Sequence, residues 1–275
     1  MEKQIITSLS NPLIKQARAL HQKKGRTESG LFLVEGIHHV GEAISAGWEV
    51  EIVFYAPHLL TSEFAREMLT RLAAKAQPVS SQVMESLADK ENPQGIVAVV
   101  RKRELALDSF HLPAYSLIKA QCVALVSPQD PGNVGTILRT MDAVGADALF
   151  LLDSEDGMRS SVELYHPTVI RSSMGTLFWK TVIQAAFHDF VDWARGGGFQ
   201  LVGTSAHGDV EYQTFNPQLP WILVLGNEQK GLSSEQIRSC DVTVSLPMRG
   251  RVSSLNLAVA AGILLYRFAD LSEIK

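Results

Sequence analysis

Three polar, glycine-containing stretches lie between residues 130 and 256, each shortly after a run of apolar residues. They are DPGNVGTILRT (130–140), GNEQKGLSS (226–234) and LPMRGRVSSLN (246–256). The preceding runs, such as CVALVS and WILVL, are typical of buried parallel strands. Ligands of parallel α/β sheets bind where strand carboxyl ends meet the following loops. These three loops are therefore the candidate places for a ligand.

The first loop suits an anion but lacks the signature of a dinucleotide site. It opens a predicted helix, whose exposed backbone N–H groups attract negative charge. Asp153 ends the next predicted strand, which invites comparison with nicotinamide-binding proteins. The fingerprint of those proteins is GxGxxG, whereas this loop offers only Gly132 and Gly135. NAD binding is therefore disfavoured.

The second loop has the glycine spacing of a phosphate-binding P-loop without its lysine. A P-loop needs Gly-Lys-Ser/Thr after the four-residue gap, because that lysine reaches the terminal phosphates. Here Gly231 is followed by Leu232, so nucleotide hydrolysis is disfavoured. A glycine-rich turn before a serine-capped helix remains the alternative.

The third loop leads into an apolar helix that ends near Arg267. Ser253 or Ser254 is expected to cap that helix. Because the helix is apolar on most sides, we expect it to be buried on most sides. The small residues at 258–262 permit close approach of an internal neighbour or a second subunit.

Bulk properties favour a soluble, cytoplasmic protein with a sizeable core. The 275 residues are 46% hydrophobic and 20% charged, with a net charge of −4. No apolar run reaches the roughly 18 residues that cross a bilayer, and the N-terminus lacks the apolar segment of a signal peptide. Cys122 and Cys240, each assigned to a strand, stand far apart and are expected to fill the core. The eight histidines form no HExxH motif, so no metal is expected.

Basic residues gather in two places despite the acidic total. Residues 1–26 hold six lysine and arginine residues against one glutamate, and Arg101, Lys102 and Arg103 form a second cluster. Local basic patches hold phosphate even when the net charge is negative. A solvated surface is the alternative for both clusters.

Alternation of strands and helices predicts two α/β domains. In the first we expect helices at 11–20, 37–46 and 61–76 and strands at 31–34, 50–56 and 95–100. In the second we expect strands at 122–127, 148–153, 199–206, 221–227 and 242–248, separated by helices. The predicted organisation is a smaller N-terminal α/β domain (1–104), a linker (105–118) and a mostly parallel α/β domain (119–275) with helices on both faces of its sheet.

The order and spacing of the three loops resemble the successive motifs of the SpoU (TrmH) family of S-adenosylmethionine-dependent RNA ribose 2′-O-methyltransferases. The matching patterns are Asn133-x-Gly135-x-x-x-Arg139, then Leu225-Gly226-Asn227-Glu228-x-x-Gly231-Leu232-Ser233, then Leu246-Pro247-Met248-x-Gly250-x-x-x-Ser254-Leu255-Asn256. Residues 169–175 are similar to another family signature, and residues 31–44 resemble the N-terminal substrate-binding domain of rRNA-directed members.

This resemblance implies a fold, a cofactor and a partner. The family has the SPOUT fold, in which the C-terminal chain threads a deep trefoil knot, and its members form homodimers through the knotted domain. S-adenosylmethionine would lie in the knot and RNA across both subunits. The implied cofactor contacts are Gly226, Leu246 and Leu255, with Thr204, Leu225, Asn227, Met248 and Ser254 nearby.

The resemblance also implies catalytic and RNA-binding residues. The family's proposal is that the arginine matching Arg139 assists deprotonation of the ribose hydroxyl. Because a guanidinium keeps its proton, we favour Arg139 as a phosphate clamp and alkoxide stabiliser, and the general-base role stays open. Orientation of substrate and arginine is expected from Asn133, Glu228, Ser254 and Asn256. Glu228 has an alternative role as a helix-start carboxylate. Candidate RNA contacts are Arg171, Arg249 and Arg251 near the cofactor and Arg18, Lys23 and Lys24 further out.

Three functions remain distinct at this point. The N-terminal domain favours rRNA as substrate, since tRNA-directed members of the family typically lack it. Methylation of tRNA is the first alternative. The second is a non-catalytic RNA-binding or ribosome-assembly protein of the same fold, against which the intact motifs argue.

Overall fold

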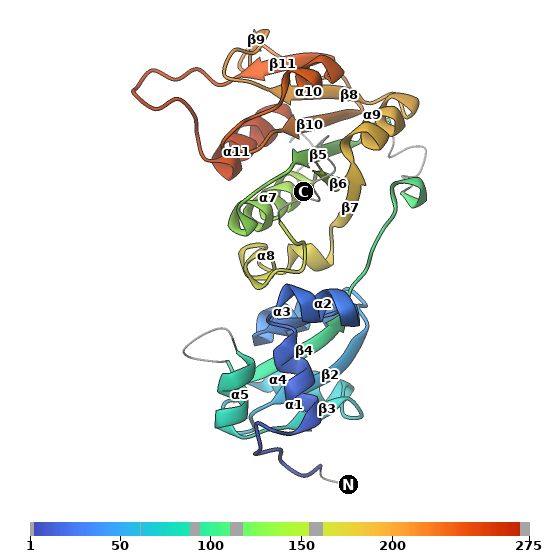
Figure 1. Ribbon diagram of the computed structural model, residues 1–275, viewed down its shortest axis with the longest axis vertical. Helices are drawn as coiled ribbons and strands as arrows, with labels where there is room; N and C mark the ends of the chain where they lie inside the picture. The colour runs from blue at the N-terminus through green and yellow to red at the C-terminus, as the bar shows by residue number, and fades with distance from the viewer. Residues whose placement is uncertain (1–2, 61, 89–93, 111–117, 154–161, 270–275) are drawn as a thin grey trace. The chain divides into compact units, whose positions relative to one another are not determined.

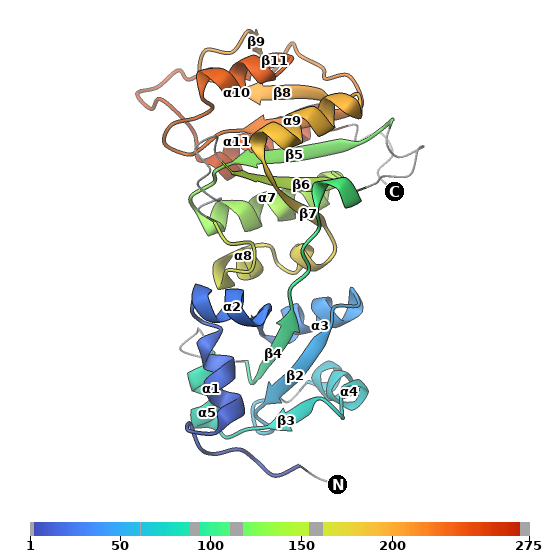
Figure 2. The same cartoon turned by 45° about the vertical axis from the view of Figure 1, so that its right-hand side comes forward.

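The computed structural model describes residues 3–60, 62–88, 94–110, 118–153 and 162–269. By packing, the chain forms two compact units (Figures 1 and 2). The N-terminal unit is residues 1–103 with 165–179, and the C-terminal unit is residues 104–164 with 180–275. The expected domain boundaries stay a prediction, and the segment 165–179 packs with the N-terminal residues.

The N-terminal unit contains a four-stranded mixed sheet in the order β1-β4-β2-β3. Its strands are β1 (Leu31–Glu35), β2 (Val50–Tyr55), β3 (Ala76–Pro78) and β4 (Ile96–Arg101). Strand β4 is antiparallel to both β1 and β2, and β3 joins β2 in parallel. The three long strands are the ones that the apolar runs predict.

Helices cover both faces of this sheet. They are α1 (Pro12–Ala19), α2 (Lys23–Ser29), α3 (Ile37–Ser45), α4 (Glu63–Arg71) and α5 (Ser81–Leu87). Helices α1 and α5 pack on one face, where Ile14 and Val83 are buried with Phe54. Helix α3 packs on β1 and β4, and none of its residues belongs to that cluster. Helix α4 lies beside α3, since the ring of Phe64 in α4 is in contact with Gly41 in α3. The first helix begins as predicted, with Asn11 as N-cap and proline as its first residue.

Short elements of this unit escape the sequence prediction. The helix expected over 61–76 ends at Arg71, because the chain turns and pairs with β2 from Ala76 onward. Helices α2 and α5 have seven residues each, too few to establish a helical period. Strand β3 has three residues, one of them Pro78.

Two short helices of the segment 165–179 are held to α3 and the following turn. They are α8 (Pro167–Ser172) and a 3₁₀ helix, η2 (Thr176–Phe178). The indole N–H of Trp48 donates to the carbonyl of Phe178 at 2.9 Å, and its ring packs edge-on against Tyr165. The indole N–H of Trp179 donates to Glu42 at 2.6 Å. Aromatic packing and these hydrogen bonds explain why this segment belongs to the N-terminal unit.

The C-terminal unit contains a seven-stranded sheet in the order β7-β6-β5-β10-β8-β11-β9, with every neighbouring pair parallel. Its strands are β5 (Gln121–Val126), β6 (Ala148–Asp153), β7 (Thr181–Ala186), β8 (Gln200–Thr204), β9 (Val210–Glu211), β10 (Trp221–Leu225) and β11 (Val242–Ser245). The predicted parallel sheet is confirmed. The two strands that the sequence missed, β7 and β9, are its edges, where exposed polar residues weaken the apolar pattern.

Helices pack on both faces of the parallel sheet. They are α7 (Pro131–Val144), α9 (Phe187–Gly196), α10 (Ser234–Ser239) and α11 (Leu257–Phe268), with a 3₁₀ turn, η1 (Leu107–Ser109), before β5. On one face, Phe187 and Phe190 of α9 are buried with Cys122 of β5. The other face is covered by α7 and α11, which pack against each other (Figure 1). The prediction that Cys240 lies in a strand is wrong, because this residue is the C-cap of α10. Its side chain is partly buried and packs against the core.

The expected trefoil knot fits this strand order and stays a prediction. A search of the described residues for a helix long and apolar enough to cross a membrane finds none.

Candidate active site at the carboxyl edge of the parallel sheet

Four neighbouring strands, β5, β10, β8 and β11, send their following loops out from one edge of the sheet. This follows from their parallel pairing. Thr204 ends β8, and its hydroxyl donates to the carbonyl of Val224 in β10 at 3.2 Å. Leu225 ends β10, and Leu246 follows β11 directly. Three predicted cofactor residues from distant parts of the chain therefore lie at the ends of adjacent strands.

Glu228 fastens the second loop to the first. One carboxylate oxygen accepts from the backbone N–H of Gln129 at 2.8 Å. The other accepts from the backbone N–H of Asp130 at 3.1 Å and from the side-chain amide of Asn133 at 3.1 Å. Glu228 is therefore a carboxylate at the start of a helix. That helix is α7, which begins directly after Asp130, and not the helix that follows Glu228's own loop.

Asn133 also makes a hydrogen bond to the third loop. Its side-chain oxygen accepts from the side-chain amide of Asn256 at 2.9 Å. The oxygen of Asn256 in turn accepts from the backbone N–H groups of Ala258 at 2.9 Å and Val259 at 3.2 Å. Asn256 is therefore the N-cap of α11, and the expectation that Ser253 or Ser254 caps this helix is wrong.

The direction of this hydrogen-bond chain is fixed at both ends by backbone donors. Glu228 faces two backbone N–H groups as an acceptor, so the amide nitrogen of Asn133 must point toward it. The oxygen of Asn133 then needs a donor, which the amide nitrogen of Asn256 supplies, and the oxygen of Asn256 is left for the helix N–H groups. Both amides thus satisfy their partners in a single orientation. We name the Glu228–Asn133–Asn256 chain the motif junction.

The loop at 226–231 folds back on itself. Asn227 and Gly231 exchange backbone hydrogen bonds of 3.2 and 2.8 Å, and the Asn227 side chain donates to the carbonyl of Ser127 at 2.9 Å. A Cβ on Gly226 would stand 2.2 Å from the carbonyl carbon of Gly231, and Gly231 itself has φ +66°. Only glycine fits at position 226, because the opposing atoms are backbone.

The loop at 246–256 is exposed along most of its length. Residues 249–256 are all exposed, among them the predicted cofactor residues Ser254 and Leu255; Met248, half-buried, lies in the same loop. Within the described chain, residues 247–255 make no hydrogen bond. Their backbone donors and acceptors are therefore unpaired within the described part of the chain.

The structure joins some predicted catalytic residues and leaves others apart. Asn133, Glu228 and Asn256 form the motif junction, whereas Ser254 lies in the open loop. Arg139 is exposed on α7, two turns beyond Asn133, and its guanidinium has no hydrogen-bond or ion-pair partner in the described part of the chain. The predicted RNA contacts are exposed on α1, α2, α8 and the 246–256 loop; they are Arg18, Lys23, Lys24, Arg171, Arg249 and Arg251.

Sequence reasoning missed the part that Asp130 plays. This residue is the N-cap of α7, and its carboxylate accepts from the backbone N–H of Gly132 at 2.7 Å. The signal was present, since aspartate before proline is typical of a helix start. No group of three or more histidine, cysteine, aspartate or glutamate residues that would suit a metal occurs among the described residues.

Comparisons with known proteins agree with this arrangement. Residues 120–266 match the model of the SpoU rRNA Methylase family, and residues 11–98 match the MRM3-like substrate binding domain. The chain is 34% identical, over 90% of its length and 85% of the relative, to the 23S rRNA (uridine(2479)-2′-O)-methyltransferase of Streptomyces viridochromogenes. It is 31% identical, over 95% of its length and 97% of the relative, to the 23S rRNA (guanosine(2553)-2′-O)-methyltransferase RlmP of Bacillus subtilis.

A solved structure extends the likeness to the whole fold. The crystal structure of an AdoMet-bound rRNA methyltransferase from Sinorhizobium meliloti superposes with a TM-score of 0.84 at 33% identity, covering 96% of each chain. The matched family model spans all three loops of the carboxyl edge. The chain is therefore a member of the SpoU rRNA methylase family.

Proposed function

We propose that this protein transfers the methyl group of S-adenosylmethionine to a ribose 2′-hydroxyl of ribosomal RNA. The observation that carries the proposal is the motif junction, which ties three loops from distant parts of the chain into one edge. The names of the relatives support the same reaction and the same class of RNA. The match to the MRM3-like substrate binding domain supports a part for the N-terminal unit in holding the substrate.

The residues present fit S-adenosylmethionine. Because Gly226 has no side chain, a ligand can approach the backbone of its loop closely. The backbone groups of residues 247–255, which make no hydrogen bond within the described chain, supply donors and acceptors. The proposed contacts are Thr204, Leu225, Gly226, Asn227, Leu246, Met248, Ser254 and Leu255. When bound, the cofactor supplies a methyl group already activated by a positive sulfur. The protein's task is then chiefly to position the acceptor.

Arg139 is proposed to hold the RNA phosphate and to stabilise negative charge as it develops on the 2′-oxygen. A guanidinium offers only hydrogen-bond donors and no acceptor, which suits these two roles better than that of a base. An unpartnered arginine forms bidentate bonds to phosphate readily. The motif junction is proposed to fix the end of the 246–256 loop, against which the acceptor ribose would bind. Ser254, two residues before Asn256, is proposed to help orient that ribose. Glu228 already accepts three hydrogen bonds, which favours an orienting role over proton transfer.

Dimerisation and location belong to the same proposal. Val259 and Tyr266 lie seven residues apart on α11 and are 51% and 56% exposed, so they form an apolar stripe. A second copy of the chain is proposed to cover it, giving a homodimer. Cytoplasmic location and action without a metal are proposed from the rRNA substrate and the cofactor chemistry.

The experiment measures methyl transfer from radiolabelled S-adenosylmethionine to purified rRNA, with tRNA as parallel acceptor. We expect transfer to rRNA, located by mapping 2′-O-methyl sites. Arg139→Ala should lower kcat by about a hundredfold or more, because removal of a charge-stabilising donor costs that much, while leaving cofactor affinity unchanged. Undiminished transfer by this variant would remove Arg139 from the mechanism. Transfer to tRNA alone would replace the proposed substrate.

A matched pair of variants separates catalysis from helix capping. Asn256→Asp keeps an oxygen that caps α11 but loses the amide that donates to Asn133, whereas Asn256→Ser keeps a cap with a shorter reach. Both should retain helical content, and both should lose methyl transfer if the junction orients the site. A calorimetric titration that detects no cofactor binding by the unaltered protein would favour the non-catalytic RNA-binding alternative.

A further inference from the structure

An open depression in the N-terminal unit gathers positive and hydrogen-bond-donating side chains. It is formed by α1, the turn after it, the end of α5 and the residues that start α8. The polar residues that line it are Lys15, Arg18, His21, Gln22, Ser86 and His166. No carboxylate lines it among the described residues. We name it the α1–α8 depression.

The charges of this depression are available to a ligand. Lys15 and Arg18 are exposed, and neither side chain has a hydrogen-bond or ion-pair partner within the described chain. They lie three residues apart on α1 and so share one face of that helix. Lys23, exposed on α2, continues the positive charge beyond the depression, whereas Lys24 on the same helix pairs with Glu28 at 3.8 Å.

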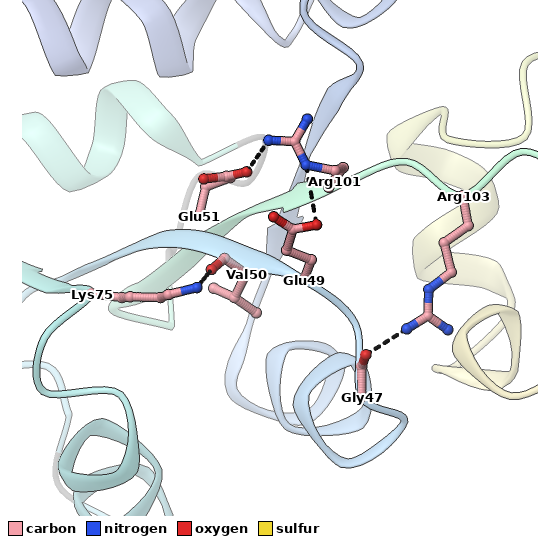
Figure 3. Close-up of polar contacts among 7 residues, drawn as sticks. All are labelled: Gly47, Glu49, Val50, Glu51, Lys75, Arg101 and Arg103. Atoms are coloured by element: carbon pink, nitrogen blue, oxygen red, sulfur yellow. Dashed lines mark hydrogen bonds and ion pairs between the residues drawn. The ribbon is translucent and has the colours of Figure 1, made fainter.

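The other basic cluster that the sequence offers is committed to the protein itself. Arg101 lies between Glu49 and Glu51, with an ion pair of 3.2 Å to Glu49 (Figure 3). These carboxylates raise the pKa of the Arg101 guanidinium above its ordinary value. Arg103 donates to the carbonyl of Gly47 (Figure 3). Its guanidinium carbon also lies over the Trp48 ring, 4.5 Å from the ring centroid. The N-terminal unit thus engages Arg101 and Arg103 in contacts of its own, whereas Lys15 and Arg18 have no side-chain partner within the described chain.

His166, which lines this depression, carries a donor on its imidazole ring. It is the N-cap of α8, and its Nδ1 accepts from the backbone N–H of Thr168 at 3.1 Å. The neutral ring must therefore carry its hydrogen on Nε2. That N–H is a donor suited to a phosphate oxygen.

Arg26 holds the backbone of the turn after α1, which forms part of the depression. Only 2% of this residue is exposed, and its guanidinium donates to the carbonyls of Leu20 at 2.7 Å and His21 at 2.8 Å. These carbonyls follow α1 and would otherwise turn partial negative charge toward the lining. Arg26 therefore positions the backbone of His21 and adds a positive charge to the local field.

We propose that the α1–α8 depression binds the phosphodiester backbone of the RNA substrate. The inference rests on the proposed function for its choice of RNA and assigns a site that includes Lys15, His21 and His166. Lysine, arginine and imidazole donors without an acidic neighbour match phosphate oxygens, and such contacts fix position without reading sequence. Folded RNA is recognised largely in this way.

The test compares two charge-matched double variants of the full chain. Lys15→Gln with Arg18→Gln removes two cations from the depression. Arg66→Gln with Arg71→Gln removes two exposed cations from α4, which belongs to the other side of the sheet. Binding of a fluorescein-labelled RNA hairpin with a single-stranded loop is followed by fluorescence anisotropy over a series of KCl concentrations.

The depression variant should bind about tenfold more weakly at moderate salt. The slope of log affinity against log salt should become shallower by about 0.7 to 0.9 for each phosphate group that the variant no longer neutralises. The α4 variant should stay within about twofold of the unaltered protein, since exposed cations away from the RNA contribute little. Equal reductions of affinity in both variants, or no reduction in the first, would overturn the proposal.

His166→Asn gives a second measurement. Asparagine keeps an oxygen for the Thr168 N–H but has no donor at the distal position, so α8 stays capped. We expect RNA affinity to fall two- to fivefold with an unchanged melting temperature, on the order of the effect of one missing hydrogen bond. Unchanged affinity would remove His166 from the site.

The outcome is separable from that of the proposed function. Methyl transfer by the unaltered protein, together with undiminished RNA binding by the depression variant, would refute the depression alone. A specific loss of RNA binding in that variant, with no methyl transfer by the unaltered protein to any RNA, would refute the proposed reaction and leave the depression standing.

Discussion

Two loops follow β10 and β11, the strands on either side of β8 in the parallel sheet, and they are held very differently. The loop at 226–231 exchanges backbone bonds between Asn227 and Gly231 and presses Gly226 against its own backbone. The loop at 247–255 makes no hydrogen bond within the described chain and is almost wholly exposed. Only its end is fastened, where Asn256 caps α11 and joins the motif junction.

The contrast indicates a division of labour at the carboxyl edge. A loop that the chain has already fixed adds little entropic cost when a ligand binds, whereas an open loop must be ordered at that moment. We infer that the first loop sets the shape of the cofactor site and that the second closes when cofactor, RNA or a second copy supplies its missing partners. The predictions below test that division.

The largest effect is expected from Gly226→Ala. The new Cβ would stand 2.2 Å from the Gly231 carbonyl carbon and 2.3 Å from the Leu232 nitrogen, so the backbone must move. Displacing a site by about 1 Å costs on the order of a hundredfold in rate, and cofactor affinity should fall with it. Calorimetry with S-adenosylmethionine and the transfer assay measure both; a fully active variant would show that this loop is not fixed.

Asn133→Asp should follow, because it breaks the junction that connects the two loops. It sets a carboxylate oxygen against Glu228 in place of a donor 3.1 Å away, at a position only 6% exposed. One of two adjacent carboxylates then has a raised pKa. At neutral pH we expect the free energy of unfolding to fall by about 1 to 3 kcal/mol, measured by urea denaturation.

The pH dependence gives the sign of that effect. As pH falls through the raised pKa of the pair, a shared proton restores a donor between the two carboxylates. The stability difference between Asn133→Asp and the unaltered protein should therefore shrink toward acidic pH. A difference that stays constant or grows on acidification would contradict the charge explanation.

Arg249→Gln with Arg251→Gln should produce an intermediate effect confined to RNA. Both residues are exposed in the open loop. RNA affinity should fall several-fold with a salt slope smaller by roughly 0.7 to 0.9 for each phosphate no longer neutralised, while cofactor affinity changes by less than about twofold. The reverse pattern, with weaker cofactor binding and unaltered RNA binding, would assign these arginines to the cofactor instead.

The smallest effect is expected from Gly250→Ala, the counterpart of Gly226→Ala in the second loop. Nothing lies within 4 Å of a Cβ built at this position, and no left-handed backbone requires glycine. Stability should change by no more than about 0.5 kcal/mol. A loss comparable with that of Gly226→Ala would mean that the second loop is as closely confined as the first.

Much of the fold was predictable because burial leaves a strong pattern in central strands. Strands β5, β10 and β11 are short apolar runs followed by turn residues, and the sequence identifies all three. Edge strands carry weaker patterns, so β7 and β9 were missed. The helix expected to extend to residue 76 shows the same limit, since pairing with β2 overrides helical spacing there.

The candidate site divides in the same way. The resemblance to the SpoU motifs grouped Asn133, Glu228 and Asn256 as candidate catalytic residues, and the structure joins them by hydrogen bonds. Which polar residue caps α11 was not readable, because Ser253, Ser254 and Asn256 have similar capping preferences and only the backbone path selects one. The role of Arg139 was not readable either, because its guanidinium has no partner among the described residues.

The sequence by itself determined a parallel α/β unit, three loops at one edge and two basic clusters, because these depend on residue type and local spacing. The tertiary structure decided the direction of the Glu228–Asn133–Asn256 chain, the fixed and open loops, and the fate of the charges. Glu49 and Glu51 neutralise Arg101, whereas Lys15 and Arg18 face no carboxylate in the described chain. The physical reason is that hydrogen bonds and ion pairs are made through space, between residues that sequence spacing does not relate.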